Sequence, residues 1–284
     1  MGSDLTWSAM YTLKTIDEWI GVINGNMAGS ARIGFKGTRI VFGGGTTDVT
    51  KPPGTGTVPT LGIQIAEREI KIKDTGIDWA QGSLIASVEN THLAINGKGF
   101  FVLSEPDADG RPVAGSKIYL TRDGEFHWNY CAVDDRYRLY NKDGLVLLDI
   151  NDVNSAAGVV EPGADGVDSV HQVIPPNDLD GEIKTSDLGI ALLNDPDNEL
   201  RFSGYGSTVF ELKTPASSSL NILAPDNDPA SRVGSVFTHT LEASNAEMTN
   251  LVPELTMSQK LYQAFSKVVQ VGMMNIDSSL GLIR

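Results

Sequence analysis

The amino-terminal residues repeat apolar or small side chains at alternating intervals of four and three positions. This spacing places them on one stripe of an α-helix. Ser3 or Asp4 can cap the start of the helix, and Gly25 and Gly29 weaken its far end. The pattern predicts a helix of roughly 24 residues, about 36 Å long at ~1.5 Å per residue. The stripe consists of Ala9, Leu13, Ile16, Ile20, Ile23 and Met27.

The carboxyl-terminal residues carry the same alternation and predict a second long helix. We expect it to start near Asn250, which can act as a cap, with Pro253 in the first turn, where a missing N–H costs no hydrogen bond. Some stripe positions are serine or glycine, which lets another helix approach closely but lowers the stability of the isolated segment. The stripe consists of Met248, Leu251, Leu255, Ser258, Tyr262, Phe265, Val269, Gly272, Ile276, Ser279 and Ile283.

Between the two ends, the pattern changes to short β-type runs separated by Asn-Gly and Asp-Gly pairs such as Asn96-Gly97 and Asp143-Gly144. These pairs favour the positive φ angles of tight hairpin turns. The 30 glycines agree with a turn-rich, mostly antiparallel β-domain. The expected strands include Leu93–Ile95, Phe100–Leu103, Ile118–Thr121, Tyr137–Asn141, Leu145–Leu148, Thr208–Leu212 and Leu220–Leu223.

The predicted elements divide the chain into three parts. Residues 1–42 and 240–284 are expected to form a helical polymerisation core, and residues 78–239 a β-rich outer domain. Residues 43–77 contain Gly43-Gly44-Gly45 and Pro52-Pro53-Gly54 and are predicted to be a connector or extension. The expected fold class is α+β, with the long terminal helices packed as a coiled-coil-like pair beside a central antiparallel β-domain.

Both helical stripes must be covered, because apolar surface left in water forfeits roughly 25 cal/mol for each Å². The two helices can cover each other, which is the simpler interpretation. Further apolar residues lie off the stripes, so we expect additional helices from identical copies, and a contact that does not close on itself produces a helical filament. The expected assembly interface comprises Leu13, Ile16, Ile20, Ile23, Met27, Leu251, Leu255, Tyr262, Phe265, Val269, Ile276 and Ile283.

Charge and composition exclude several classes of protein. The 284 residues have a net charge of −14, which argues against a protein that binds nucleic acid or an anionic membrane surface. No apolar run approaches the ~18 to 20 residues of a membrane-spanning helix, so membrane insertion is not expected. The first 20 residues lack the pattern of a cleavable signal peptide. The single cysteine, Cys131, excludes an internal disulfide.

No pattern of catalytic, cofactor-binding or metal-binding residues is found. The four histidines, at positions 92, 127, 171 and 239, lack zinc-site spacing. Gly54-Thr55-Gly56, Gly97-Lys98-Gly99 and Gly204-Tyr205-Gly206 lack the third glycine of a dinucleotide loop and are interpreted as turns. Acidic runs at 107–110 and 194–199 lack the twelve-residue calcium loop and are better explained as solvated turns. We therefore expect a protein that is not an enzyme and holds no cofactor.

Several segments of the β-domain match family motifs. Residues 79–84 (WAQGSL) and 93–103 (LAINGKGFFVL) match the pattern QGSL…LAINGxGFFVV, and residues 120–126 (LTRDGEF) match YTRDGxF. Residues 139–147 (LYNKDGLVL) match L…xDGxxVL. Together they resemble the bacterial flagellar axial proteins, the rod and hook family. Nothing in residues 96–101 indicates a reaction centre, so their simplest role is to maintain the fold.

The terminal segments extend this resemblance. Residues 241–245 (LEASN) match LExSNV, and residues 259–270 (QKLYQAFSKVVQ) match QRAYQAN…KVIQ. Residues 25–36 keep part of NNIANxNTxGFK but differ at several Asn and Thr positions. The motif residues are Asn26, Gly34, Phe35, Lys36, Asn96, Gly97, Gly99, Phe100, Phe101, Arg122, Asp123, Gly124, Ser244 and Asn245. Arg122 is expected to pair with Asp123 or a neighbouring group as an exposed ion pair contributing ~0 to 1 kcal/mol.

The resemblance implies a structural subunit that self-assembles into a helical tubular filament outside the cell or at its surface, exported without a cleavable signal peptide. Its implied partners are copies of itself and other axial proteins of the same filament. An alternative is an acidic extracellular adhesin or binding module with a two-helix stalk. In that interpretation Trp128, Tyr130 and Tyr137 line a ligand groove, although such residues more often pack across strands.

Overall fold

The computed structural model describes residues 2–44, 48–49, 64–65, 69–113, 115–131, 136–148, 153–154, 159–160, 183, 188–214, 219–225 and 233–282. The chain forms two compact units. The first contains Met1–Ala28, Thr38–Asp78 and Ala246–Arg284, and the second contains Gly29–Gly37 and Trp79–Asn245. The predicted α+β class, with terminal helices and a central antiparallel β-domain, is confirmed.

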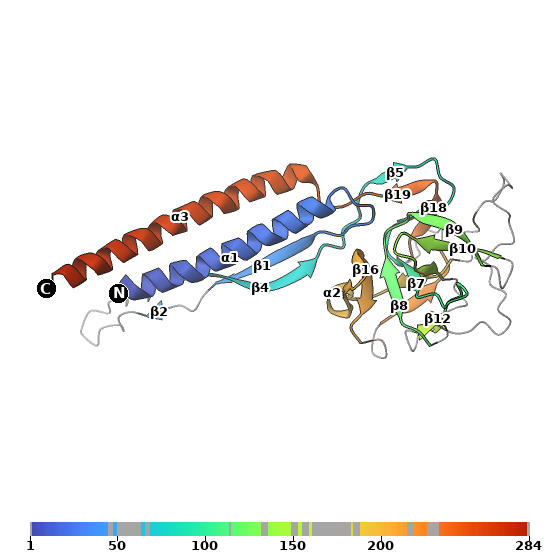
Figure 1. Ribbon diagram of the computed structural model, residues 1–284, viewed down its shortest axis with the longest axis horizontal. Helices are drawn as coiled ribbons and strands as arrows, with labels where there is room; N and C mark the ends of the chain where they lie inside the picture. Colours follow the sequence, from blue (N-terminus) through green and yellow to red (C-terminus); the bar gives the residue numbers. More distant parts are fainter. Residues whose placement is uncertain are drawn as a thin grey trace, which may run out of the picture. The chain divides into compact units, whose positions relative to one another are not determined.

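The first unit consists of two long helices and a β-hairpin that lie side by side (Figure 1). Helix α1 spans Gly2–Gly29 and helix α3 spans Met248–Gly281. The hairpin pairs β1 (Thr38–Gly44) with β4 (Ile70–Ile77) in antiparallel register. The short strands β2 (Asp48–Val49) and β3 (Gln64–Ile65) also pair with each other.

Helices α1 and α3 run antiparallel. Near one end Thr6 lies against Gly272, and toward the other the indole N–H of Trp19 donates to Glu254 Oε1 at 2.8 Å. The helices approach closely: a Cβ added at Gly272 would lie 2.7 Å from Thr6 Oγ1. Ser258 is also buried. The small residues predicted in the α3 stripe therefore do permit close packing of a second helix.

Helix α3 starts near the predicted position, but its predicted cap was wrong. The helix begins at Met248 after Glu247, so Asn250 lies in its first turn and is not its cap. Pro253 consequently lies inside the helix and removes the hydrogen bond that its N–H would give to the carbonyl of Thr249. The helix continues through this exposed position near its amino end, and Leu251 is buried there.

The hairpin is attached to α1 at both of its ends. At one end, the Asn26 side chain donates to the Thr38 carbonyl at 2.7 Å and accepts from its N–H at 2.8 Å. At the other, the Ile70 N–H donates to Thr12 Oγ1 at 3.3 Å, and Thr15 Oγ1 donates to the Ile70 carbonyl at 3.0 Å. These contacts satisfy backbone groups that an isolated two-stranded sheet leaves unpaired.

Residues 70–77 were assigned to a connector by the sequence analysis, but they form β4. The signal was present, because Ile70 and Ile72 alternate with Lys71 and Lys73. The isoleucines are half-buried and the lysines exposed, as in a strand covered on one face.

The second unit is built around an antiparallel sheet with the strand order β15-β16-β8-β7-β11-β10-β9, and β14 pairs with both β7 and β17. Smaller sheets pair β18 with β6, β19 with β5 and β12 with β13. A one-turn helix, α2 (Pro196–Glu199), precedes β15. The strands are β5 (Leu84–Ala86), β6 (Leu93–Asn96), β7 (Phe100–Ser104), β8 (Ile118–Thr121), β9 (Phe126–Cys131), β10 (Arg136–Asn141), β11 (Val146–Leu147), β12 (Val153–Asn154), β13 (Val159–Val160), β14 (Ile190–Leu192), β15 (Leu200–Ser203), β16 (Gly206–Leu212), β17 (Asn221–Leu223), β18 (Ser235–Thr238) and β19 (Thr240–Glu242).

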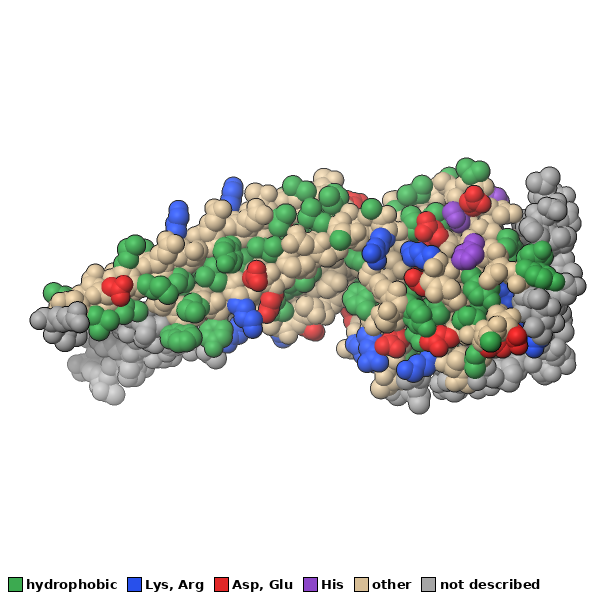
Figure 2. Space-filling view, viewed as in Figure 1, with side chains coloured by type: hydrophobic (Ala, Val, Ile, Leu, Met, Phe, Trp, Pro, Cys, Tyr) green, Lys and Arg blue, Asp and Glu red, His purple; other side chains and the backbone are tan. Residues whose placement is uncertain are grey.

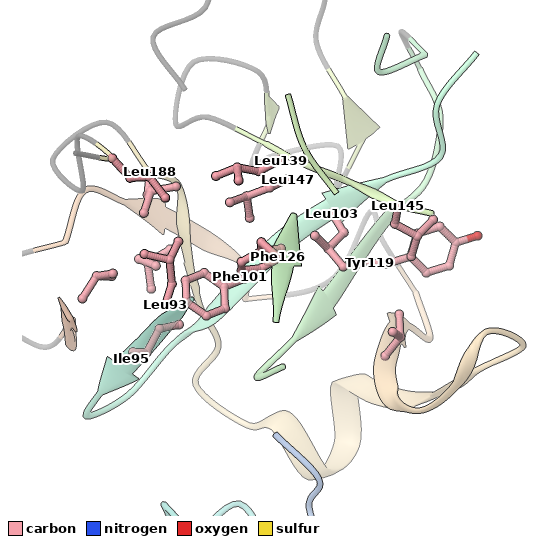
Figure 3. Close-up of a cluster of buried hydrophobic side chains, with 14 of the residues drawn as sticks. Leu93, Ile95, Phe101, Leu103, Tyr119, Phe126, Leu139, Leu145, Leu147 and Leu188 are labelled. Carbon is pink, nitrogen blue, oxygen red and sulfur yellow. The ribbon is translucent and has the colours of Figure 1, made fainter. Parts of the chain in front are cut away.

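The core of the second unit lies where these sheets meet. Phe101 and Phe126 pack edge to face, with ring centroids 5.3 Å apart, and Leu93, Leu103 and Leu139 surround them (Figure 3). All of these residues are fully or almost fully buried. Each strand expected from the sequence is present within a few residues of its predicted bounds.

Candidate functional site

The family motifs of the second unit converge on one buried carboxylate, that of Glu242. Its Oε1 accepts from Lys36 Nζ at 2.6 Å and from the Gly82 N–H at 2.9 Å, and its Oε2 accepts from Arg122 Nη1 at 3.0 Å. The side chains of Lys36, Glu242 and Arg122 are 1%, 0% and 5% exposed. We call these three residues the ion network. With two cations and one anion, it carries a formal charge of +1.

Arg122 is held on several sides. Its Nη1 also donates to the Ile95 carbonyl at 3.2 Å, its Nη2 donates to the Gly97 carbonyl at 2.6 Å, and the guanidinium lies 5.4 Å from the centre of the Phe100 ring. Burial lowers the pKa of Arg122, and the negative charge of Glu242 opposes that shift. An arginine remains charged at neutral pH.

The prediction of an exposed ion pair for Arg122 is therefore wrong. Arg122 is buried and pairs with Glu242, which lies 120 positions later in the sequence. Its neighbour Asp123 pairs instead with Lys142 and accepts from the Glu125 N–H at 3.1 Å. Spacing along the chain gave no indication of the pairing with Glu242.

Segments 34–37 and 242–245 are joined around the ion network. The Gly34 N–H donates to the Glu242 carbonyl at 2.8 Å. Asn245 Oδ1 accepts from the Gly37 N–H at 2.7 Å, while Asn245 Nδ2 and Lys36 Nζ both donate to the Ala80 carbonyl, at 3.0 and 2.8 Å. These bonds satisfy backbone groups of three distant segments and explain the presence of Lys36 and Asn245 in the motifs.

The backbone conformation at position 34 requires a glycine. Its φ is +66°, and a Cβ would lie 2.3 Å from the backbone nitrogen of Asp123. A side chain there would push the 34–37 segment away from the ion network. Burial differs among the other motif residues of the second unit. The buried ones are Phe35, Gly99, Phe100, Phe101 and Gly124, which is separated from β9 by Glu125. Ser244 is half-buried, and Asn96 and Gly97 lie at the exposed end of β6.

Asn26, the remaining motif residue, is not part of the ion network. It belongs to the first unit, where it binds the start of β1. Asn26 thus belongs to a hairpin clamp, together with Thr12 and Thr15, whereas Lys36 and Arg122 belong to the ion network. In both places the side chains are used to hold backbone segments together.

The predicted assembly residues differ in burial within the chain. Ile16, Ile23 and Leu251 are buried, and Tyr262 and Ile276 are exposed. Ile283 lies outside the described residues. Leu13, Ile20, Met27, Leu255, Phe265 and Val269 are half-buried. The sequence analysis missed Thr12, Thr15 and Trp19, which contact the hairpin and α3 and extend the buried face of α1 beyond the predicted stripe.

Packing of α1 on α3 leaves many large apolar side chains of the first unit exposed. Trp7 on α1 is 61% exposed and Met274 on α3 is 64% exposed. Figure 2 shows hydrophobic side chains distributed along the visible face of the helices. On the two helices the exposed set comprises Trp7, Met10 and Tyr11 of α1, Met248, Val252, Met257, Tyr262, Val268, Val271, Met273, Met274, Ile276 and Leu280 of α3, and Leu282 just after α3.

The aromatic residues considered for a ligand groove pack across neighbouring strands. Tyr130 lies opposite Tyr137, with ring centroids 5.1 Å apart, and Trp128 lies opposite the buried Leu139 and packs against the core. Trp128 and Tyr130 thus continue the core-facing side of β9. Their arrangement is explained by cross-strand packing.

Within the described part of the chain, no three His, Cys, Asp or Glu side chains form a group that could hold a metal ion. None of the helices in that part has the length and apolar character needed to cross a membrane.

Comparison with known proteins gives relatives that extend along most of the chain. The flagellar basal-body rod protein FlgG of Buchnera aphidicola subsp. Baizongia pistaciae is 23% identical over 267 residues, 93% of each sequence. The resemblance to the flagellar axial family is confirmed. FlgG of Caulobacter vibrioides is 25% identical over 255 residues, 88% of each sequence, and FlgG of Bacillus subtilis is 24% identical over 275 residues, 93% of this chain and 92% of its own. No family model matches the sequence.

Proposed function

We propose that this protein is a structural, non-catalytic subunit of a flagellar rod- or hook-type filament and that it assembles with copies of itself through its first unit. Its similarity to flagellar basal-body rod proteins along most of the chain supports a structural role in a flagellum. Other axial proteins of the same filament are proposed as further partners. The proposed location is the basal body or a similar filament at the cell surface.

The observation that carries the self-assembly proposal is the apolar surface that remains on α3. Val271, Met273, Met274 and Leu280 are each more than half exposed although α3 already packs against α1. Burying a fully exposed side chain of this kind contributes about 1.5–3 kcal/mol, and covering the exposed half contributes roughly half of that. A neighbouring helix that covered several of them would therefore gain a substantial free energy. Apolar patches of this kind mark interaction surfaces.

The distribution of charge supports contacts between identical first units. The first unit has 9 Lys and Arg against 11 Asp and Glu, a net charge of −2. The second has 13 against 25, a net charge of −12. Like charges repel, so contact between two second units would cost more electrostatic energy than contact between two first units. Assembly through the first units therefore keeps the strongly acidic units in solvent.

The experiment uses the full-length protein over a range of concentrations, followed by sedimentation velocity and electron microscopy. Wild-type protein is expected to form filaments above a critical concentration. The double variant Val271→Glu/Met274→Glu should raise that concentration at least tenfold, because it places two charges on the apolar surface. The matched control, Gln270→Glu/Asn275→Asp, adds the same charge at exposed polar positions of α3 and should have a much smaller effect.

Two results would contradict the proposal. One is wild-type protein that stays monomeric at high concentration while amide exchange shows α1 and α3 to be fully protected. The other is equal assembly of the two double variants. Discrete particles that bind a ligand through the second unit would favour the adhesin alternative.

A further inference from the structure

The first unit contains a groove whose walls come from all three of its elements. Ile16 and Trp19 of α1, Phe42 and Ile70 of the hairpin, and Leu261 and Phe265 of α3 line a volume of about 560 Å³. Trp19 and Phe42 pack edge to face, with ring centroids 5.1 Å apart. A groove of this size and apolar character is in the range that accommodates aromatic groups of a ligand.

The same unit displays aromatic side chains that are more than half exposed. Trp7 and Tyr11 lie one turn apart on α1 and are 61% and 55% exposed, and Met10 beside them is also exposed. Tryptophan and tyrosine combine a large apolar surface with one polar group and are frequent anchors of protein interfaces.

Trp7 cannot reach the groove of its own chain. Nine residues, about two and a half turns, separate Trp7 from Ile16, so the two side chains leave α1 on opposite sides, roughly 13 Å apart along the axis. A groove that receives Trp7 must therefore belong to another molecule.

The edge of the groove offers a hydrogen-bond acceptor for the N–H of an indole. Glu69 lines the groove and pairs with Lys71 at 2.5 Å. Two other tryptophans of this chain donate the indole N–H to a carboxylate at 2.8 Å: Trp19 to Glu254 and Trp79 to Asp197. A Trp7 indole entering the groove would find a similar acceptor in Glu69.

We propose that the groove of one copy receives Trp7 and Tyr11 of a second copy. This inference rests on the proposed self-assembly and names one contact between the copies. The low net charge of the first unit, −2, makes a second copy an electrostatically acceptable occupant. Because the donor side chains and the groove are different surfaces of the same unit, the contact is heterologous, and each added copy presents a new groove or a new donor. Such a contact extends into an open chain of subunits.

The test uses two full-length variants. The donor variant, Trp7→Ala/Tyr11→Ala, keeps its groove, and the groove variant, Leu261→Glu, keeps its donor. Each is expected to raise the critical concentration for assembly about tenfold or more, as loss of an interface anchor does. The matched controls are Val88→Ala, which trims an exposed apolar side chain of the second unit, and Gln263→Glu, which adds a charge at an exposed position of α3. Circular dichroism and thermal unfolding establish that every variant is folded.

Mixing the two variants separates this contact from a general loss of stability. The intact groove of the donor variant can receive the intact Trp7 and Tyr11 of the groove variant. The resulting dimer cannot extend, because its remaining groove carries Leu261→Glu and its remaining donor lacks Trp7 and Tyr11. The mixture should therefore form one-to-one dimers of twice 30.4 kDa at concentrations where each variant alone is monomeric.

Three outcomes would overturn the inference or its basis. If both variants assemble like wild-type protein, or if the folded variants remain monomeric when mixed, the groove does not hold Trp7 and Tyr11. In either case filaments of the wild-type protein would still support the proposed function. If wild-type protein itself never assembles, the proposed function fails and this inference with it.

Discussion

Replacing Lys36 by methionine tests the ion network directly. The substitution keeps a long, unbranched side chain but removes the cation that lies 2.6 Å from Glu242 Oε1, where both side chains are at most 1% exposed. Breaking a buried ion pair by removing one partner costs about 3–5 kcal/mol. We expect the lower end, about 3 kcal/mol, because Arg122 and the Gly82 N–H still bind the carboxylate.

The charge of the network predicts an order among variants. Lys36→Met lowers its formal charge from +1 to 0, whereas Glu242→Gln raises it to +2 and removes the carboxylate that both buried cations contact. Glu242→Gln should therefore be the more destabilising substitution, by about 4–5 kcal/mol relative to wild type. The double variant should be less destabilised than the sum of the single variants, with a coupling of about 0.5–3 kcal/mol.

Thermal unfolding followed by circular dichroism measures these effects. For a domain of this size, 1 kcal/mol lowers the melting temperature by about 2–4 °C, so Lys36→Met should lower that of the second unit by about 6–12 °C. Lys98→Met, which removes an exposed lysine near the network, serves as the control and should change it little. If Lys36→Met behaves like Lys98→Met, or if Glu242→Gln is the milder change, the reasoning from buried charge is refuted.

Three further predictions concern other parts of the molecule. Asn26→Ala removes both hydrogen bonds to Thr38 and should cost the first unit about 1–3 kcal/mol, measured as faster amide exchange in β1; unchanged exchange would contradict the clamp. Hydrogen bonds from Tyr119, the larger effect, and from Tyr205 lower the pKa of Glu105 below its ordinary 4.5. The stability that these bonds contribute is therefore present above pH 4.5 and is lost as the pH falls through the lowered pKa. Glu105→Gln should flatten that acid dependence in unfolding measurements, and an unchanged pH profile would count against it. Finally, raising the salt concentration screens the charge of −12 on the second unit and should lower the critical concentration for assembly, measured by sedimentation; a rise would contradict the proposed repulsion.

The ion network also affects how truncations must be designed. Deleting residues 1–42 would remove Lys36 together with α1 and would leave β4 without its partner β1. Such a protein could fail to fold for reasons unrelated to assembly. Substitutions at exposed positions of the full chain avoid this problem.

The sequence alone determined the elements whose stability depends on local pattern. The 3-4 spacing of apolar residues predicted α1 and α3, and the Asn-Gly and Asp-Gly turns with short apolar runs predicted most strands of the second unit. The motifs also predicted the similarity to flagellar rod proteins that extends along most of the chain. These features can be read from the sequence because they depend on residues close together along the chain.

The tertiary structure alone decided which distant residues meet. Glu242 pairs with Lys36 and Arg122 across 206 and 120 positions, and no periodicity encodes such a contact. The hairpin clamp was missed for the same reason. In the sequence, Thr12 and Asn26 cannot be distinguished from other polar residues of a helix. Only the fold brings the backbone of Ile70 and Thr38 within hydrogen-bonding distance of them. Because these side chains are buried, their hydrogen bonds and ion pairs contribute to the free energy of folding: a polar group removed from water must find its partner within the fold.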